Sequence, residues 1–225
     1  MNGDYAKQAY PALPALSDDE RLARVTAFYE QLRTRRTCRM FTDAPVPRTI
    51  IEQALLAAGT APSGANHQPW HFAAISSPEV KREVRELAEE EERAFYSGKA
   101  SAEWLAALAP LGTDEDKPYL EVAPWLIAVF GQRKGGISPG DQHQNYYVTE
   151  SVGIAVGMLL AALHDAGLAT LTHTPAPMKF LNRICQRPAD EKPLMLLVVG
   201  HPAPDATVPV HATLRKPLSQ IASWF

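Results

Sequence analysis

The chain has 225 residues, a length that suits one domain of generous size or two small ones, and its 46% hydrophobic and 21% charged residues predict a globular protein with a real core. A formal charge of -3 argues against nucleic acid as a partner, because binding phosphate backbones requires a basic surface. Cys38 and Cys185 stand far apart, which excludes a cysteine-built metal site and suits a reducing cytoplasm. The polar residues 1–20 have the character of neither a signal peptide nor a membrane anchor, and the apolar stretch 152–163 is too short for a bilayer. We therefore expect a soluble cytoplasmic protein with no membrane partner.

The first predicted helix covers about residues 18–34. Ser17 and Glu20 form a capping box at its start, since each satisfies a free backbone amide near the other. Its apolar residues recur at helical spacing and predict one buried face. This face comprises Leu22, Val25, Phe28, Tyr29 and Leu32.

The remaining elements follow from periodicity and from the residues that begin or end helices. Further helices are expected over residues 49–58, 77–96, 145–166 and 179–185. Strands are expected over residues 71–75, 125–130, 168–172 and 194–199. This order lacks the strict strand–helix alternation of a doubly wound sheet and favours an α+β fold.

Three segments and one helix have special character. Residues 97–119 have no strong periodicity and are interpreted as a mobile excursion, whereas residues 134–140 form a glycine-rich loop. The helix over 145–166 is apolar nearly all round, which predicts burial on several sides, and Gly153 and Gly157 within it allow another helix to approach closely. The proline-rich tail, residues 201–225, has no core of its own and needs a surface to wrap around, in a homodimer the other subunit.

Four arginines cluster just after the first helix, at Arg33, Arg35, Arg36 and Arg39, with Thr37 among them. Guanidinium groups hold a phosphate through paired hydrogen bonds, and a neighbouring hydroxyl adds a donor. A run of charges is usually a solvated surface, so the pattern alone leaves phosphate binding open.

Two further runs are candidates for ligand binding. In residues 60–66 the small side chains and Gly64 let backbone amides approach a ligand closely. In residues 170–175, at the end of a buried strand, threonine hydroxyls are placed to hydrogen-bond a ring nitrogen. An ordinary surface turn and ordinary strand threonines remain open alternatives for these two runs.

Neither metal nor covalent catalysis is indicated. His67 and His71 are four residues apart, but Pro69 between them prevents the single helix face that a metal pair would use. Motifs of P-loops, dinucleotide-binding folds, zinc proteases and serine hydrolases are all missing.

Taken together, residues 32–221 resemble the nitroreductase superfamily, and specifically its iodotyrosine deiodinase branch. Arg35–Arg39 (RRTCR) is similar to the family's segment for the phosphate of FMN, and residues 58–70 (AGTAPSGANHQPW) to its AGTAPSGAxxxPW loop. Thr172–Pro175 stands where the family has a threonine-rich strand end, and Arg215–Leu218 (RKPL) matches its C-terminal motif.

The deiodinase branch is indicated by a lid, expected here at about residues 88–120. In that branch the lid supplies a glutamate, a tyrosine one helical turn on, and a lysine further along, which hold an amino-acid zwitterion over the flavin. Glu92, Tyr96 and Lys117 have this spacing. The resemblance implies that Glu92 takes the ammonium, and that Tyr96 and Lys117 take the carboxylate. A solvated acidic helix end with an unrelated lysine is the alternative.

The resemblance also implies a fold, an assembly and a set of cofactor contacts. The fold would be a single α+β domain over residues 1–225, with a mostly antiparallel sheet flanked by helices, in an intertwined homodimer. Residues 1–16 would form an arm, residues 201–225 would wrap the partner, and each FMN site would be built from both subunits. The implied FMN-binding residues are Arg35, Arg36, Thr37, Arg39, Pro62, Ser63, Gly64, Thr172, His173, Thr174 and Arg215.

Three residues have particular implied roles near the flavin ring. Thr174 is the implied catalytic residue, because its hydrogen bond to the flavin N5 tunes the ring. The backbone amide of Ala65 would meet the substrate phenolate. His173 departs from the family pattern, which often has another threonine here, so its contacts with the flavin are expected to differ.

The implied activity is FMN-dependent reductive dehalogenation of halogenated tyrosine, which releases tyrosine and halide. A general NAD(P)H-dependent nitro- or quinone reductase is the main alternative, and in it the lid residues would be incidental. A flavin-fragmenting enzyme gives the lid residues no role, and a non-catalytic flavin or amino-acid carrier would bind without turnover.

Overall fold

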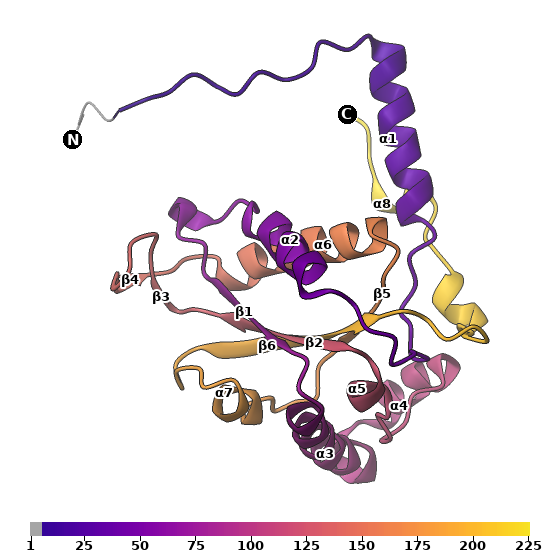
Figure 1. Ribbon diagram of the computed structural model, residues 1–225. Helices are drawn as coiled ribbons and strands as arrows, with labels where there is room; N and C mark the ends of the chain where they lie inside the picture. The colour runs from indigo at the N-terminus through magenta and orange to yellow at the C-terminus, as the bar shows by residue number, and fades with distance from the viewer. Residues whose placement is uncertain (1–5) are drawn as a thin grey trace. The chain divides into compact units, whose positions relative to one another are not determined.

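The computed structural model describes residues 6–225, which fall into two compact units that divide after Thr34 (Figure 1). The first unit contains α1 (Asp18–Leu32), which starts at the predicted capping box: Ser17 N–H donates to Glu20 Oε2 over 2.7 Å and Glu20 N–H to Ser17 Oγ over 3.2 Å. The prediction that one face of this helix is buried is wrong for the single chain, because no residue of α1 is buried. A single helix has no second surface on which to bury its apolar side chains.

The second unit is built around an antiparallel sheet of four strands in the order β1-β2-β6-β5. The strands are β1 (Trp70–Ile75), β2 (Trp125–Gly131), β5 (Ala169–His173) and β6 (Lys192–Gly200). This confirms the predicted strands to within a few residues and the predicted antiparallel sheet. The expected glycine-rich loop, residues 134–140, begins with β3 (Lys134–Gly135), which pairs with β4 (His143–Gln144) in a small hairpin.

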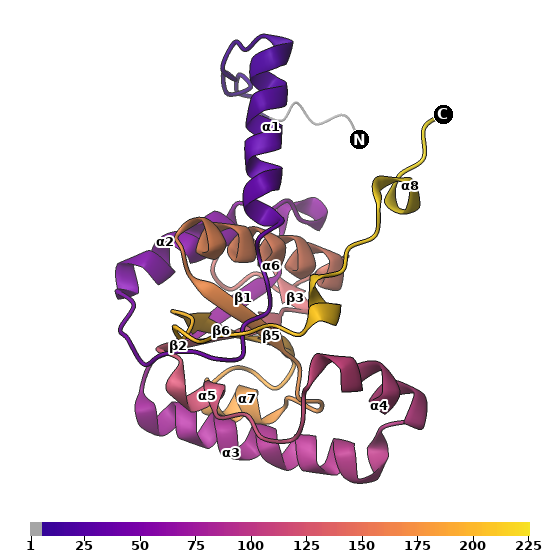
Figure 2. The same ribbon diagram turned by 90° about the vertical axis from the view of Figure 1, so that its right-hand side faces the viewer.

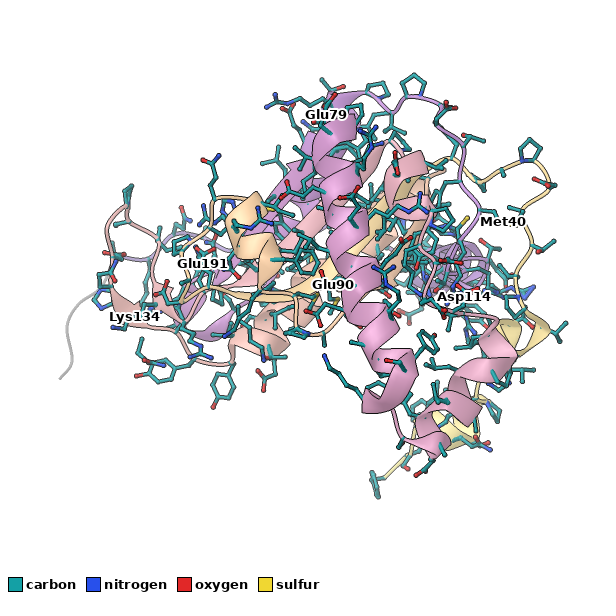
Figure 3. All side chains as sticks on the ribbon, turned by 90° about the horizontal axis from the view of Figure 1, so that it is seen from below. Met40, Glu79, Glu90, Asp114, Lys134 and Glu191 are labelled. Carbon is teal, nitrogen blue, oxygen red and sulfur yellow. The ribbon has the colours of Figure 1, made fainter. Side chains whose placement is uncertain are left out.

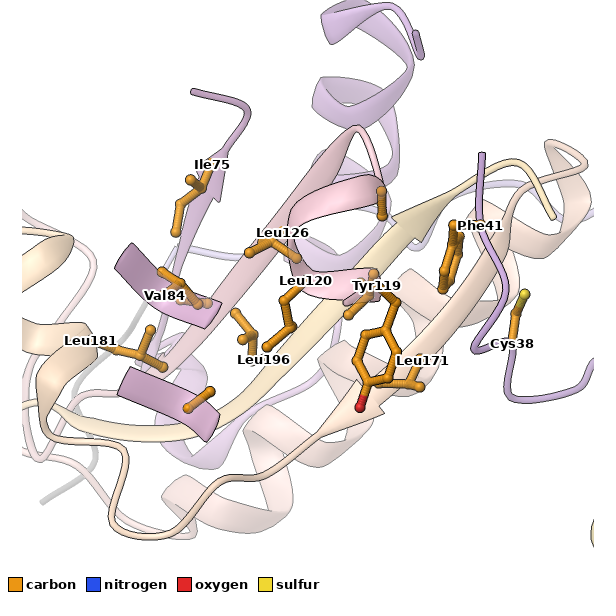
Figure 4. Packing of buried hydrophobic residues seen from close by; sticks show 14 of the residues in the cluster. Cys38, Phe41, Ile75, Val84, Tyr119, Leu120, Leu126, Leu171, Leu181 and Leu196 are labelled. Carbon is orange, nitrogen blue, oxygen red and sulfur yellow. The ribbon is translucent and has the colours of Figure 1, made fainter. Parts of the chain in front are cut away.

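Helices cover both faces of the sheet (Figures 1 and 2). The helices on one face are α2 (Arg48–Gly59) and α6 (Val148–Asp165), and those on the other are α3 (Pro78–Ala94), α5 (Tyr119–Val122) and α7 (Phe180–Ile184). The central strand β2 is buried throughout and alternates between two cores, since successive side chains point to opposite faces. Leu126 packs with α3, α5 and α7 (Figure 4), as does Phe130. Ile127 and Val129 pack with α2 and α6.

Residues 97–119 were expected to lack regular structure, but most of residues 97–111 are helical. A turn of π-helix over Phe95–Lys99 is followed by α4 (Ala102–Leu108) and a 3-10 turn over Ala109–Leu111. Ser101 caps α4 by accepting from Trp104 N–H over 3.2 Å. Periodicity missed these elements because each spans only one or two turns. Figures 2 and 3 show α4 beside the C-terminal end of α3.

Helix α6 is buried on one side only, which corrects the prediction of burial on several sides. Val152, Val156, Leu159 and Leu163 pack into the core, but Ile154 is 47% exposed. A Cβ atom at Gly153 or Gly157 would meet nothing within 4 Å, so this side of the helix is open. Among residues 6–225, α6 alone has the length and mean hydropathy of a membrane span, and its buried side is that of a core helix.

The C-terminal segment leaves the sheet after β6. It contains a 3-10 turn over Val210–Thr213 and α8 (Leu218–Ile221), and neither has a buried residue. Large apolar side chains are exposed along it, including Val210 at 80% and Trp224 at 84%. Within the single chain the segment therefore has no apolar surface to pack on, as the sequence predicted.

Candidate functional site

The arginine-rich segment runs along the outer edge of β5. Thr37 forms a parallel bridge with Thr170, and Cys38 N–H donates to the Thr170 carbonyl over 3.0 Å. Cys38 is buried in the core between the sheet and α3, which fixes the segment from inside. The fold thus places residues 35–39 beside the strand that ends in the threonine-rich run.

Positive charges are concentrated at this edge. Burial lowers the pKa of the Arg35 guanidinium, and the charges of Arg215 and Arg36 lower it further, so the three cations lie near one another. Within residues 6–225 no carboxylate pairs with Arg35, which is half-buried. Guanidinium groups that lie close together are stabilised by an anion, and a phosphate group fits this cluster.

The three predicted lid residues meet at one place. Lys117 is almost fully buried, and its Nζ lies 3.3 Å from Glu92 Oε2 and 5.7 Å from the centre of the Tyr96 ring. The same Nζ donates to the Asp114 carbonyl, and the Tyr96 hydroxyl donates to the Thr113 carbonyl over 3.0 Å. Burial raises the pKa of Glu92, while the Lys117 ammonium acts in the opposite direction. Opposite charges are therefore held together out of water.

His173 joins this cluster through its side chain. It points to the same face of β5 as Leu171, its ring meets Tyr119 edge-on at 6.1 Å, and its Nε2 lies 3.9 Å from Glu92 Oε1. This buried Nε2 has no hydrogen-bond partner. Burial lowers the pKa of His173 to about 3, with further effects from Lys117 and Arg39, so the ring is neutral at neutral pH. Thr172 and Thr174, its neighbours in sequence, are exposed.

The small-residue loop lies at the opposite edge of the sheet, before β1. Ala65 and Asn66 have left-handed backbone conformations, with φ of 52° and 56°. Ser63 Oγ accepts from Gln68 N–H over 2.9 Å and closes the loop. A Cβ at Gly64 would stand 2.8 Å from the Tyr146 carbonyl oxygen, so only glycine lets the loop lie this close to the start of α6.

One further side chain holds this loop and was not anticipated from the sequence. The Oδ1 atom of buried Asn145 accepts from His67 Nδ1 over 2.8 Å, and the Asn145 side-chain N–H donates to the Gln132 carbonyl over 2.9 Å. Asn145 and His67 are 78 residues apart, and nothing local in the sequence signals their pairing.

The predicted cofactor residues thus fall into two groups in the single chain. Residues 35–39 and 172–174 lie at the β5 edge and residues 62–65 at the β1 edge, with three strand spacings, about 14 Å, between the edge strands. Figure 1 shows the same separation, with the loop before β1 at the left and the segment after α1 running down to the right of the sheet. The structure unites Glu92, Tyr96, Lys117 and His173, but it does not bring residues 62–65 to them.

Comparison with known proteins identifies the family. The sequence profile described as "Nitroreductase family" matches residues 32–201. This chain belongs to the nitroreductase family. An iodotyrosine deiodinase from Haliscomenobacter hydrossis is 50% identical over 191 residues, which cover 85% of this chain and 86% of the relative. Iodotyrosine deiodinase 1 of Homo sapiens is 43% identical over 91% of this chain and 70% of its own length.

Solved structures agree with this assignment. A crystal structure of oxidized iodotyrosine deiodinase bound to FMN and 3-iodo-L-tyrosine has a TM-score of 0.68 and 30% identity, and the match covers 79% of this chain and 90% of that one. A nitroreductase-like protein from Streptococcus mutans has a TM-score of 0.64 at 17% identity and is similar in fold. The chain thus has the nitroreductase fold and its relatives lie in the iodotyrosine deiodinase branch.

Proposed function

We propose that this protein is an FMN-dependent oxidoreductase that removes halide from halogenated tyrosine and releases tyrosine. The observation that carries the proposal is the buried pair of Glu92 and Lys117 beside Tyr96, at the end of β5. A carboxylate, an ammonium and a phenol at one place complement the two charges of an amino acid. Relatives named iodotyrosine deiodinase support the same activity. Those of Haliscomenobacter hydrossis, Nematostella vectensis and Homo sapiens are 41–50% identical to this chain.

The residues at the β5 edge fit FMN. Arg35, Arg36, Arg39 and Arg215 supply the positive charge that a phosphate requires, and the Thr37 hydroxyl adds a donor. Thr172 and Thr174 are exposed at the end of β5, where Thr174 would hydrogen-bond the flavin N5. Bound reduced FMN would supply two electrons, which together with one proton replace the carbon–halogen bond by a carbon–hydrogen bond and release halide.

The substrate's charges would be met by the lid. The ammonium pairs with the Glu92 carboxylate, and the carboxylate pairs with Lys117 and the Tyr96 hydroxyl. The backbone N–H of Ala65 would donate to the phenolate oxygen. Closing the lid excludes water from the reacting carbon and orients the ring.

A homodimer completes the site in this proposal. Residues 62–65 lie at the β1 edge of their own chain, so the same residues of a second copy would reach the flavin. The open side of α6, with Gly153, Ile154 and Gly157, offers an apolar surface for that copy. The exposed apolar side chains of the C-terminal segment fit a tail that packs on the other subunit.

An anaerobic single-turnover measurement tests the activity. The purified FMN protein is reduced and mixed with 3-iodotyrosine, and flavin reoxidation is followed together with tyrosine and iodide. Equal amounts of tyrosine, iodide and oxidised flavin are expected. Flavin that stays reduced with 3-iodotyrosine, but is oxidised by nitroaromatics or quinones, would establish the general reductase instead.

A further inference from the structure

One face of α3 and of the π-helical turn that continues it carries three polar side chains, which contact residues 113–117. Glu89, Glu92 and Tyr96 are spaced three and four residues apart, so they lie on the same side of the helix. Glu92 and Tyr96 have roles in the proposed binding of the zwitterion. Glu89 is one helical turn before them and has no role in that binding.

Glu89 holds the backbone of Lys117. Its Oε1 accepts from the Lys117 backbone N–H over 2.8 Å, although the two residues are 28 positions apart in the sequence. The same Oε1 accepts from Arg85 Nε over 2.8 Å. Partial burial acts to raise the pKa of Glu89, but the hydrogen bonds from Arg85 and Lys117 outweigh it and lower the pKa below its ordinary value. Glu89 is therefore an ionised acceptor that joins α3 to the end of the lid.

The chain just beyond Lys117 is tied to α3 by other contacts. The buried Lys81 ammonium donates to the carbonyls of Glu121 and Ala123 over 2.9 Å and 2.7 Å, which closes the end of α5. Arg85 reaches the Glu121 carboxylate over 3.2 Å. Along α3, Glu89 is thus the last residue before Glu92 that holds the chain where it returns at Lys117.

The other end of the lid has a different character. After Tyr96 the chain turns at Gly98, whose φ of 159° lies at the border of the range in which glycine is favoured, and no other residue would contact a Cβ there. Asp114, Glu115 and Asp116, just before Lys117, are exposed. Between Gly98 and Asp116, α4 and its flanking turns contain no buried residue. This part of the lid has no buried residue and is held near its end only through the Thr113 and Asp114 carbonyls, whereas Lys117 itself is buried.

We propose that Glu89 is a positioning residue, which fixes the Lys117 backbone so that the Lys117 ammonium meets Glu92 and the substrate carboxylate, and which makes Lys117 the fixed end of the lid. The inference rests on the proposed function. It explains why Lys117 is buried although the three residues before it are exposed. Without Glu89, the Lys117 N–H loses its acceptor and Arg85 keeps only its contact with Glu121, so the Lys117 ammonium is released toward solvent.

The test uses three variants of the FMN-loaded protein. Glu89→Ala removes the acceptor, Glu89→Gln keeps an oxygen for the Lys117 N–H, and Glu90→Ala is the matched control. Glu90 is the next residue of the same helix, is exposed and is one of the labelled side chains in Figure 3. Each variant is titrated with FMN and with 3-iodotyrosine, and the binding is followed by flavin fluorescence. Amide hydrogen exchange of the peptide that contains Lys117 is measured without substrate.

We expect Glu89→Ala to weaken 3-iodotyrosine binding by about tenfold or more, the effect of losing a charge-assisted hydrogen bond, with FMN affinity unchanged. Its Lys117 peptide should exchange faster. Glu89→Gln should recover most of both properties, and Glu90→Ala should match the wild type. Recovery by glutamine separates the acceptor role from a general loss of structure.

The outcomes for the two proposals are distinct. If Glu89→Ala binds 3-iodotyrosine as the wild type does, with unchanged exchange, Glu89 does not position Lys117. A Glu89→Gln variant as weak as Glu89→Ala also overturns the acceptor role. If the wild type itself does not bind 3-iodotyrosine, the proposed function fails, and exchange of the Lys117 peptide still decides whether Glu89 fixes that end of the lid.

Discussion

Replacing His173 by glutamine should remove a pH-dependent loss of stability. Burial lowers the pKa of His173 from 6.5 to about 3, so the folded chain keeps the ring neutral while the unfolded chain takes up a proton below pH 6.5. The stabilisation is thus fully present above pH 6.5 and is lost as the pH falls toward 3. At pH 5, about 1.5 pH units below the ordinary pKa, the unfolded chain is protonated at this ring. Its protonation lowers the free energy of unfolding by about 2 kcal/mol relative to pH 7.

The measurement is urea unfolding of wild type and His173→Gln at pH 7 and pH 5, at one protein concentration because assembly changes apparent stability. The wild type should lose about 2 kcal/mol more than the variant between the two pH values. Glu92 has a raised pKa and acts with the opposite sign, but it titrates in both proteins, so the comparison isolates His173. Equal losses in the two proteins would mean that His173 is protonated in the folded state, and would refute the argument from its buried, unpartnered Nε2.

Three other substitutions test the remaining parts of the site. Glu92→Gln should weaken 3-iodotyrosine binding by roughly ten- to a hundredfold with FMN still bound, and an unchanged affinity in fluorescence titration would remove Glu92 from the site. Gly64→Ala places a Cβ 2.8 Å from the Tyr146 carbonyl oxygen and should displace the loop. The free energy of unfolding should fall by about 1–3 kcal/mol and FMN should bind more weakly. An FMN affinity equal to that of the wild type would contradict the loop's role. Ile154→Glu puts a charge on the open side of α6 and should give monomers in light scattering, whereas a stable dimer would show that this side is not the interface.

The sequence predicts well those features of the fold that depend on neighbouring residues alone. The capping box at Ser17 starts α1 where expected, and the alternation of side chains along β5 follows from its sequence. The resemblance to the deiodinase branch named Glu92, Tyr96 and Lys117 together, and the structure brings them into one cluster. Such spacing transfers because α3 and the π-helical turn that continues it place Glu92 and Tyr96 on one helical face.

What the sequence does not predict depends on contacts between distant segments. The pairing of His67 with Asn145 has no local signal, because the side chains come together only when β2 and the loop before β1 are in place. The apolar face of α1 was read as a buried face, and the same pattern fits a surface that another chain covers. Short helices such as α4 are set by a single cap and a few contacts, which periodicity over one turn does not reveal.

The Glu92–Lys117 pair explains why an amino acid is a suitable ligand for the proposed site. Both groups are already out of water, and removing one partner from a buried pair leaves an uncompensated charge that costs several kcal/mol. A zwitterion exchanges the partners, since its ammonium replaces Lys117 at Glu92 and its carboxylate replaces Glu92 at Lys117. A phenol without these groups, or with only one of them, must either leave the pair closed or strand one charge. In the proposed site, discrimination among halogenated phenols would therefore arise from the pair itself, before the halogen reaches the flavin.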